Sequence, residues 1–369
     1  MLVLSYVSDL HACGWVRSIV PAAAINASSA FDEDAPNPIK VIPKGDISYA
    51  DWHAADVMVL HRKSTVEWLR YAEEARRRGI ALVYEIDDDV WNIPPEFAKP
   101  HDFYSADDIR GAMRRIIELC HAIVVSTEEL AEVVRAQFPG RSVHVIENAV
   151  DPMVAEQAYQ ERVARLQRNL NRPLIIGWHA SQSHVVLDLP IVRNVIPAVL
   201  KADQRLRFHV VGWPNLDNWP ELRDVHDQVR CEGWVHQSEL PFRIAQFDVG
   251  IAPLMPNAWN VAKSPQKVLE YGLLEVPAVA SPAPCYQRYA DTGPGLVIPH
   301  ENDPAQWYDA LRMITTNDAF RAQLGEQARV TVLNQWNSHG RATQWESLFR
   351  KVRAECRGNK PLAVEAVAT

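Results

Sequence analysis

The amino-acid sequence predicts an α/β protein with two doubly wound domains, each built on a parallel sheet. Three observations support this fold class. Apolar strand segments alternate with helical segments in both halves, and 369 residues is a length that favours two domains. A charged helical stretch at 152–172 contains no strand and separates the two series. Two such domains present the carboxyl ends of their strands, where open α/β sheets bind ligands, to a cleft between them.

The first half contains six strand signals. Strands are expected at 2–7, 40–42, 56–60, 80–86, 122–126 and 142–146, with helices at 64–78, 106–120 and 127–137. Gly14 opens the turn after the first strand and leads into a helix that carries Arg17. Arg17 is therefore a candidate phosphate contact, with an exposed helix arginine as the alternative. A GxGxxG dinucleotide motif is absent.

The most polar strand end of this half is YEIDDDVWNIPPE, at 84–96. Three interpretations compete: a divalent metal site, a general base or anchor for an acceptor hydroxyl, and a solvated acidic loop. Clustered carboxylates after a buried strand are costly to hold together, which favours a functional role. Asp88 and Asp89 are the catalytic candidates, and Asp87 is placed on the acceptor side.

The second half repeats the alternation. Strands are expected at 173–181, 206–213, 229–235, 247–254, 276–281 and 296–299, with the later helices at 304–315, 317–333 and 338–356. The predicted organisation is a first domain at 1–152, a crossover at 153–172, a second domain at 173–335, a helix at 336–358 that packs back on the first domain, and a tail at 359–369.

One stretch of the second half, Lys263 to Ser281, carries the strongest functional signal. Ser264 and Pro265 suit the start of a helix, and the spacing of Lys263, Lys267 and Glu270 places all three on one helix face. A helix N-terminus with two lysines is a seat for a diphosphate, and Glu270 can accept hydrogen bonds from sugar hydroxyls. The alternative is an amphipathic surface helix with a Lys–Glu pair.

The turn after the strand at 173–181 is a second candidate. Gly177, Ser181 and Ser183 are small enough to let backbone N–H groups approach a phosphate. His179 and His184 flank this turn, but further zinc ligands at suitable spacing are missing. His184 is a candidate proton carrier or hydroxyl ligand on the acceptor side.

The composition argues against several classes of protein. A net charge of −8 provides no basic footprint for general nucleic-acid binding. Five cysteines without a CxxC pair fit reduced thiols, and we expect a cytoplasmic protein. The first ten residues are expected to form a strand and not a signal peptide, and no apolar run is long enough for a membrane span.

The motif NxxKSPxKxxEYxxxxxPxVAS, preceded by GWVxxxELxxxxxxFDVGIAPL, resembles the C-terminal half of GT-B glycosyltransferases. The similarity is to the large retaining family that uses nucleotide-sugar donors, including bacterial and phage group 1 proteins. The segments HACGWVRSIVPAAAI, IVVSTEELAEVV, VHVIENAVD and LIIGWHASQSHVVLDLP are also similar to elements of this family, so the resemblance extends to about residue 350. It implies two Rossmann-like domains facing each other across a cleft.

The resemblance also implies roles for individual residues. Glu270 would hold the ribose hydroxyls, and Lys263 and Lys267 would contact the diphosphate or stabilise it as a leaving group. The remaining donor-side candidates are Gly233, Trp234 and Val235 along the nucleobase, together with Ser181, Ser281, Ser264, Asn260, Gly14 and Arg17. Two departures stand out: Ala262 replaces a second glutamate, with Asn260 as its possible substitute, and Glu275 replaces a glycine.

The expected function is transfer of a sugar from a nucleotide diphosphate sugar, with UDP and GDP sugars most favoured, to an acceptor hydroxyl. The resemblance implies retention of configuration and no obligatory metal or other cofactor. The acceptor is a glycan, a protein, a lipid-linked sugar or a modified nucleic acid. The alternatives are a nucleotide-sugar epimerase of related fold and a non-catalytic protein that binds sugar nucleotides or glycans.

Overall fold

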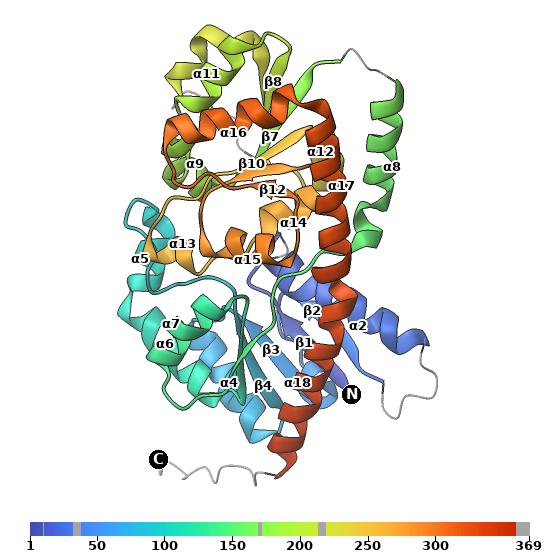
Figure 1. Ribbon diagram of the computed structural model, residues 1–369. Helices are drawn as coiled ribbons and strands as arrows, with labels where there is room; N and C mark the ends of the chain where they lie inside the picture. The colour runs from blue at the N-terminus through green and yellow to red at the C-terminus, as the bar shows by residue number, and fades with distance from the viewer. Residues whose placement is uncertain (10, 32–37, 169–171, 213–218, 359–369) are drawn as a thin grey trace. The chain divides into compact units, whose positions relative to one another are not determined.

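The computed structural model describes residues 1–9, 11–31, 38–168, 172–212 and 219–358. These residues form two compact units, each with its own sheet (Figure 1). Unit 1 contains residues 1–147 and the segment from Ser338 onward, and unit 2 contains Asn148–Asn337. The expected tail at 359–369 lies outside the described residues.

Unit 1 is built on a parallel sheet with the strand order β2-β1-β3-β4-β5-β6. The chain reverses its direction of sheet growth between β1 and β3, which makes this pair the topological switch point. The strands are β1 (Leu2–Tyr6), β2 (Lys40–Lys44), β3 (Val57–His61), β4 (Ala81–Ile86), β5 (Ala122–Val125) and β6 (Val143–Val145).

The helices of unit 1 cover both faces of this sheet, which explains why all six residues of β4 are buried. Side-chain caps start two of them, because Thr65 accepts a bond from the Trp68 amide and Thr127 from the Leu130 amide. The helices are α1 (Ala12–Gly14), a π-helix (Trp15–Ile19), α2 (Val20–Phe31), α3 (Asp51–Ala54), α4 (Val66–Arg77), α5 (Ala98–Ser105), α6 (Asp107–Leu119), α7 (Glu128–Gln137) and α18 (Ser338–Gly358).

The last helix, α18, belongs to the core of unit 1. Its buried residues Trp345, Phe349 and Val352 share one apolar cluster with Ile25 of α2 and Val83 of β4. Polar contacts support this packing, since Arg353 Nη1 donates to Gly79 O at 2.8 Å and Arg341 pairs with Glu147 at 2.9 Å. The segment from Ser338 therefore completes the unit that begins with residue 1.

Unit 2 has the strand order β12-β11-β10-β7-β8-β9, also parallel throughout. This is the doubly wound order of nucleotide-binding α/β domains, with its switch point between β7 and β10. The strands are β7 (Leu174–His179), β8 (Leu206–Val211), β9 (Val229–Glu232), β10 (Val249–Ala252), β11 (Ala278–Ala280) and β12 (Leu296–Val297). The predicted α/β fold class is thus confirmed in both halves.

The helices of unit 2 include α8 in the expected crossover, and α8 packs against α12 and α14. The α15 helix was not expected from the sequence. The helices are α8 (Pro152–Arg168), α9 (Gln182–Leu187), α10 (Leu189–Val192), α11 (Val195–Ala202), a 3₁₀ helix (Pro220–Gln228), α12 (Leu240–Ile244), α13 (Ala258–Val261), α14 (Gln266–Leu273), α15 (Pro284–Thr292), α16 (Pro304–Thr316) and α17 (Asp318–Gln335). No helix in the described part of the chain combines the length and hydropathy that crossing a bilayer requires.

The start of α14 differs from the sequence prediction. The helix begins at Gln266 with Pro265 in the cap position, and Ser264 does not cap it. Instead, Ser264 Oγ accepts a hydrogen bond from Asn148 Nδ2 at 2.8 Å. A proline has no N–H to satisfy, so this helix start needs one capping bond fewer.

One glycine-dependent contact and two hydrogen bonds, all made by Tyr271, fix α14 against the sheet. Gly250 of β10 lies under the ring of Tyr271 and leaves no room for a Cβ atom. The Tyr271 hydroxyl donates to Ile251 O at 3.0 Å and accepts from the His179 amide at 3.3 Å. The helix is therefore anchored to the ends of both switch-point strands, β7 and β10.

Candidate active site

The side chains of α14 lie at the switch point of unit 2, beyond the carboxyl ends of β7 and β10. Glu270 is held there from two sides. Gln266 Nε2 donates to its Oε1 at 2.9 Å, and His179 Nε2 lies 3.0 Å from its Oε2. Burial opposes its ionisation, but His179, Gln266 and Lys267 together hold the pKa of Glu270 below the ordinary value. Glu270 is therefore a fixed carboxylate, suited to accepting hydrogen bonds.

Lys267 lies one turn before Glu270 and is a buried cation. Its side chain is 9% exposed, and its Nζ lies 2.6 Å from His184 Nε2. Burial lowers the pKa of Lys267 to about 8, while Asp188 and Glu270 act in the opposite direction. At neutral pH the ammonium is charged and donates to a neutral imidazole, which leaves positive charge available for an anion.

His184 connects this lysine to a buried acid. Its Nδ1 lies 2.8 Å from Asp188 Oδ2, one helical turn away. Burial and the neighbouring Lys267 lower the pKa of His184 to about 3, so the imidazole is neutral. The sequence grouped His184 with the acceptor side. The structure places it against Lys267 in unit 2.

Lys263 precedes α14 and is oriented by an aromatic ring. Its Nζ lies 3.5 Å from the centroid of the Trp259 ring, a cation–π contact, and Trp259 itself is buried. Lys263 and Lys267 therefore both lie at the start of α14, as the sequence predicted. Trp259, on α13, is a positioning group that the sequence analysis did not identify.

Asn260 and Ser281 support the loop after β10. Asn260 Nδ2 donates to Met255 O at 2.9 Å and to Asp188 Oδ1 at 3.3 Å. The Ser281 hydroxyl accepts from the Leu254 amide at 2.8 Å. Both side chains are buried, so the structure gives them a role in fixing the loop. Asn260 Oδ1 is also buried and accepts no hydrogen bond within the described residues.

The other donor-side candidates of unit 2 lie at neighbouring strand ends. Ser181 is exposed and directly precedes α9, which follows β7. Gly233, Trp234 and Val235 follow β9. Trp234 is 57% exposed and makes an edge-to-face contact with His236, so one large aromatic surface is presented to solvent.

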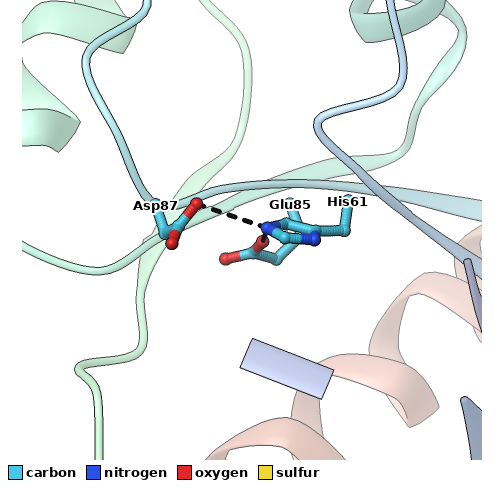
Figure 2. A group of neighbouring side chains, drawn as sticks. All are labelled: His61, Glu85 and Asp87. Atoms are coloured by element: carbon cyan, nitrogen blue, oxygen red, sulfur yellow. Dashed lines mark hydrogen bonds and ion pairs between the residues drawn. The ribbon is translucent and has the colours of Figure 1, made fainter. Parts of the chain in front are cut away.

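The acidic strand end of unit 1 forms an ion-pair network with two arginines. Figure 2 shows the side chains of His61, Glu85 and Asp87 grouped together. His61 Nε2 lies 3.3 Å from Glu85 Oε2 and 3.3 Å from Asp87 Oδ1. Arg17 Nε lies 2.6 Å from Glu85 Oε1, and Arg62 Nε lies 3.1 Å from Asp87 Oδ1. Burial opposes ionisation of Asp87, but Arg62 and His61 hold its pKa well below the usual range.

The ligand atoms of His61, Glu85 and Asp87 lie within 4.8 Å of one another, which is a spacing that can hold a metal ion. Two observations argue against a cation here. The Ser8 amide donates to His61 Nδ1 at 3.3 Å and Arg62 Nε donates to His61 Nε2 at 3.3 Å, so N–H groups of the protein already face both ring nitrogens. The guanidinium groups of Arg17 and Arg62 already balance the two negative charges. The donor set therefore fits a metal ion poorly.

The remaining candidates of unit 1 are mostly buried. Arg17 is 3% exposed and donates to Ile146 O at 2.7 Å as well as to Glu85. Gly14 allows close approach of Asp9 O, where a Cβ would not fit. Asp89 is fully buried and accepts from the Trp91 and Asn92 amides at 3.1 and 3.2 Å, which closes a turn.

These contacts hold Arg17, Gly14 and Asp89 within unit 1, where Arg17 and Asp89 are buried. Asp88 is half-buried, and Asp87 is held by His61 and Arg62. Arg62 was missed by the sequence analysis. It adopts φ = +50°, an uncommon conformation for a residue with a side chain, directly after β3. A sequence carries no clear signal for such a backbone angle at an arginine.

The comparisons with known proteins agree with this geometry. Residues 177–317 match the family model described as glycosyl transferases group 1. HepE of Anabaena, solved with UDP and glucose, has a TM-score of 0.62 and 13% identity, over 95% of this chain and 99% of that chain. Sucrose-phosphate synthase of Thermosynechococcus elongatus has a TM-score of 0.61 and 13% identity, over 96% of this chain and 99% of that chain.

A third solved structure is WaaG, a glycosyltransferase involved in lipopolysaccharide biosynthesis. It has a TM-score of 0.60 and 13% identity, over 97% of this chain and 100% of that chain. A search of the curated proteins by sequence finds no match.

The two doubly wound units have the fold of solved GT-B glycosyltransferases. Its second unit carries a group 1 glycosyltransferase domain at 177–317. The resemblance drawn from the sequence motifs is therefore confirmed for the fold, and the family match at 177–317 supports the enzyme class.

Proposed function

We propose that the enzyme transfers a sugar from a UDP-sugar to an acceptor hydroxyl, with retention of configuration. The observation that carries this proposal is the pair on α14, in which the buried Lys267 ammonium faces a neutral imidazole and the Glu270 carboxylate follows one turn later. A buried cation whose hydrogen bond goes to a neutral group is suited to an incoming anion.

The reaction breaks the bond between the anomeric carbon and the diphosphate through an oxocarbenium-like transition state. Negative charge then develops on the departing diphosphate. Lys263 and Lys267 stabilise this charge, and both are held before the reaction starts, by Trp259 and His184 respectively. Such preorganised electrostatic stabilisation is commonly the largest catalytic contribution.

Glu270 binds the ribose hydroxyls in this proposal. Gln266 donates a hydrogen bond to one oxygen of Glu270 and His179 Nε2 lies 3.0 Å from the other, so the carboxylate is already ordered before the nucleotide binds. The exposed Trp234 ring, with Gly233 and Val235 beside it, offers a surface for the nucleobase. Ser181 lies near the phosphates at the end of β7.

UDP is our choice of nucleotide because the structurally similar HepE was solved with UDP and with UDP-glucose. GDP sugars are the alternative donor. The acceptor is a glycan, a protein, a lipid-linked sugar or a modified nucleic acid, and we place Asp87 and Asp88 on its side. The five free cysteines fit a reducing compartment, so we propose a cytoplasmic location.

Titration calorimetry with UDP, GDP and ADP, followed by donor turnover measurements, tests this proposal. We expect UDP to bind the wild type. We expect Lys267→Ala to lower turnover by at least about 100-fold, the usual cost of one lost transition-state contact, and Glu270→Ala to weaken UDP binding and lower turnover through the lost ribose contact. Lys201→Ala is the matched control, since Lys201 is an exposed lysine of α11 paired with Asp224. Unchanged turnover in both site variants would overturn the donor-site assignment.

Product analysis separates the enzyme classes. An epimerase would convert the donor sugar without an acceptor, whereas a transferase releases UDP and forms a new glycoside or a hydrolysis product. The configuration of the new bond, measured by NMR, tests retention directly.

A further inference from the structure

We propose that Asp188, acting through His184, is a positioning residue that fixes the Lys267 ammonium in the donor site and couples it to the loop at 255–260. This proposal rests on the donor site described under the proposed function. We place neither Asp188 nor His184 in contact with the sugar or the phosphates.

The three side chains form one polarised chain of hydrogen bonds. Lys267 Nζ lies 2.6 Å from His184 Nε2, and His184 Nδ1 lies 2.8 Å from Asp188 Oδ2. An ammonium can only donate, and a carboxylate can only accept. The imidazole must therefore carry its proton on Nδ1 and present a lone pair at Nε2, and Asp188 is what enforces this tautomer.

The second oxygen of Asp188 organises a different segment. Asp188 Oδ1 accepts from the Met255 amide at 2.8 Å and from Asn260 Nδ2 at 3.3 Å. Asp188 is 1% exposed, so this acid is held in the interior of unit 2 by bonds to both of its oxygens. Met255 and Asn260 belong to the loop and short helix that lead to Lys263. One buried carboxylate thus links the positions of both donor lysines.

The charge of Asp188 also affects the pKa of Lys267. Burial lowers the pKa of Lys267, and the negative charge of Asp188 is the strongest opposing influence. The titratable groups that face Lys267 are His184, Asp188, Glu270, Lys263 and Cys285. Without the charge of Asp188, the lysine would lose its proton at a lower pH.

Asp188→Asn tests this chain with little change in shape. The amide oxygen can still accept from Met255 and Asn260, so the loop keeps its bonds. The amide nitrogen then faces His184 Nδ1 as a donor and selects the opposite tautomer, which turns an N–H toward the Lys267 ammonium. Two donors facing each other displace the lysine or remove its proton.

The measurement is UDP affinity by titration calorimetry from pH 6.5 to 9.5. For the wild type, we expect affinity to fall as pH rises through about 8, because an uncharged Lys267 no longer attracts the diphosphate. For Asp188→Asn, we expect affinity at pH 7 to fall about tenfold or more, and the loss with pH to begin at a lower pH. His184→Gln, which keeps an acceptor for the lysine, should bind UDP more tightly than His184→Ala.

Asp224→Asn is the charge-matched control, because Asp224 is an exposed acid of unit 2 paired with Lys201. It should bind UDP as the wild type does at every pH. Circular dichroism and thermal melting verify that Asp188→Asn is folded. Wild-type affinity in the folded variant, or an equal loss at every pH, would overturn the positioning role. Failure of the wild type to bind any nucleotide would instead overturn the proposed function.

Discussion

At the residue scale, the buried charge of Lys267 lowers the stability of the folded protein, although the proposed function requires it. The pKa of Lys267 is about 8 in the folded protein and 10.5 in an unfolded chain. Below pH 8 both states carry the proton, so folding bears the full cost of burying the charge. Between pH 8 and 10.5 the folded lysine releases its proton while the unfolded one keeps it, and the cost is relieved.

We therefore predict that Lys267→Met stabilises the protein at pH 7, by about 1–3 kcal/mol on the scale of 1.36 kcal/mol per pKa unit. The gain should shrink as pH approaches 10.5, and UDP binding should be lost. Urea denaturation at pH 7 and pH 10 measures both effects. A methionine variant that is less stable at pH 7 would contradict the idea that this site trades stability for anion binding.

Glu275 is a second residue of interest, because its backbone conformation is one that non-glycine residues disfavour. It adopts φ = +57°, the left-handed region in which glycine is favoured, at the end of α14. The sequence motif also pointed to glycine at this position. Two contacts offset the strain, since Glu275 Oε1 accepts from Tyr159 at 2.7 Å and its carbonyl accepts from Arg162 at 3.2 Å. The tight turn before β11 is therefore kept without glycine.

At the element scale, α18 shows how a helix remote in sequence completes a core. Its residues Trp345 and Phe349 are buried in unit 1, with ring centroids 5.6 Å apart. The guanidinium of Arg17 lies 5.6 Å from the Trp345 ring, so this helix also covers the buried Arg17–Glu85 pair. Removal of this helix face would expose both apolar surface and a buried charge.

We predict that Trp345→Ala destabilises unit 1 by about 3–5 kcal/mol, the usual cost of deleting a buried aromatic side chain. UDP affinity of the folded protein should stay within about twofold of the wild type, because Trp345 belongs to unit 1 and the donor residues belong to unit 2. Lys351→Ala, on an exposed position of the same helix, is the control. Thermal melting and calorimetry provide the two measurements, and a large loss of UDP affinity in the folded variant would refute this separation.

At the scale of the whole molecule, most of the fold could be predicted from the sequence. Every strand expected in the two halves is present, because parallel strands buried on both faces leave continuous apolar runs such as IALVYEI. The positions of Lys263, Lys267 and Glu270 also followed from helical spacing. The shorter helix α15 was missed, because a few residues carry little periodic signal, and the helix expected around Arg17 begins as a π-helix at Trp15–Ile19.

The rest of the site depended on contacts between distant segments. Asp188 is 79 residues from Lys267 in the chain, and no local pattern reveals that His184 connects them. The only hint was the four-residue spacing of His184 and Asp188, which places both on one helix face. The burial of polar residues also could not be predicted from the sequence. Asp89 and Arg17 were candidates for ligand contact because of their residue types, whereas both side chains are buried in unit 1.

The two units have separate sheets and separate hydrophobic clusters, so a ligand of unit 2 should stabilise that unit selectively. UDP at about 100 times its Kd adds about 2.7 kcal/mol to the stability of the form that binds it. For a unit of this size, that corresponds to about 5–10 °C in melting temperature. We predict that scanning calorimetry resolves two transitions and that UDP raises only one of them.

Trp345→Ala identifies the other transition, because this substitution should lower the melting of unit 1 and leave the UDP-sensitive transition in place. Lys267→Ala serves as the ligand control and should abolish the shift without removing either transition. A single transition whose melting temperature rises with UDP would contradict the prediction that the two units unfold independently. It would mean that the nucleotide site in unit 2 and the core completed by α18 unfold together, so that donor binding stabilises the entire chain.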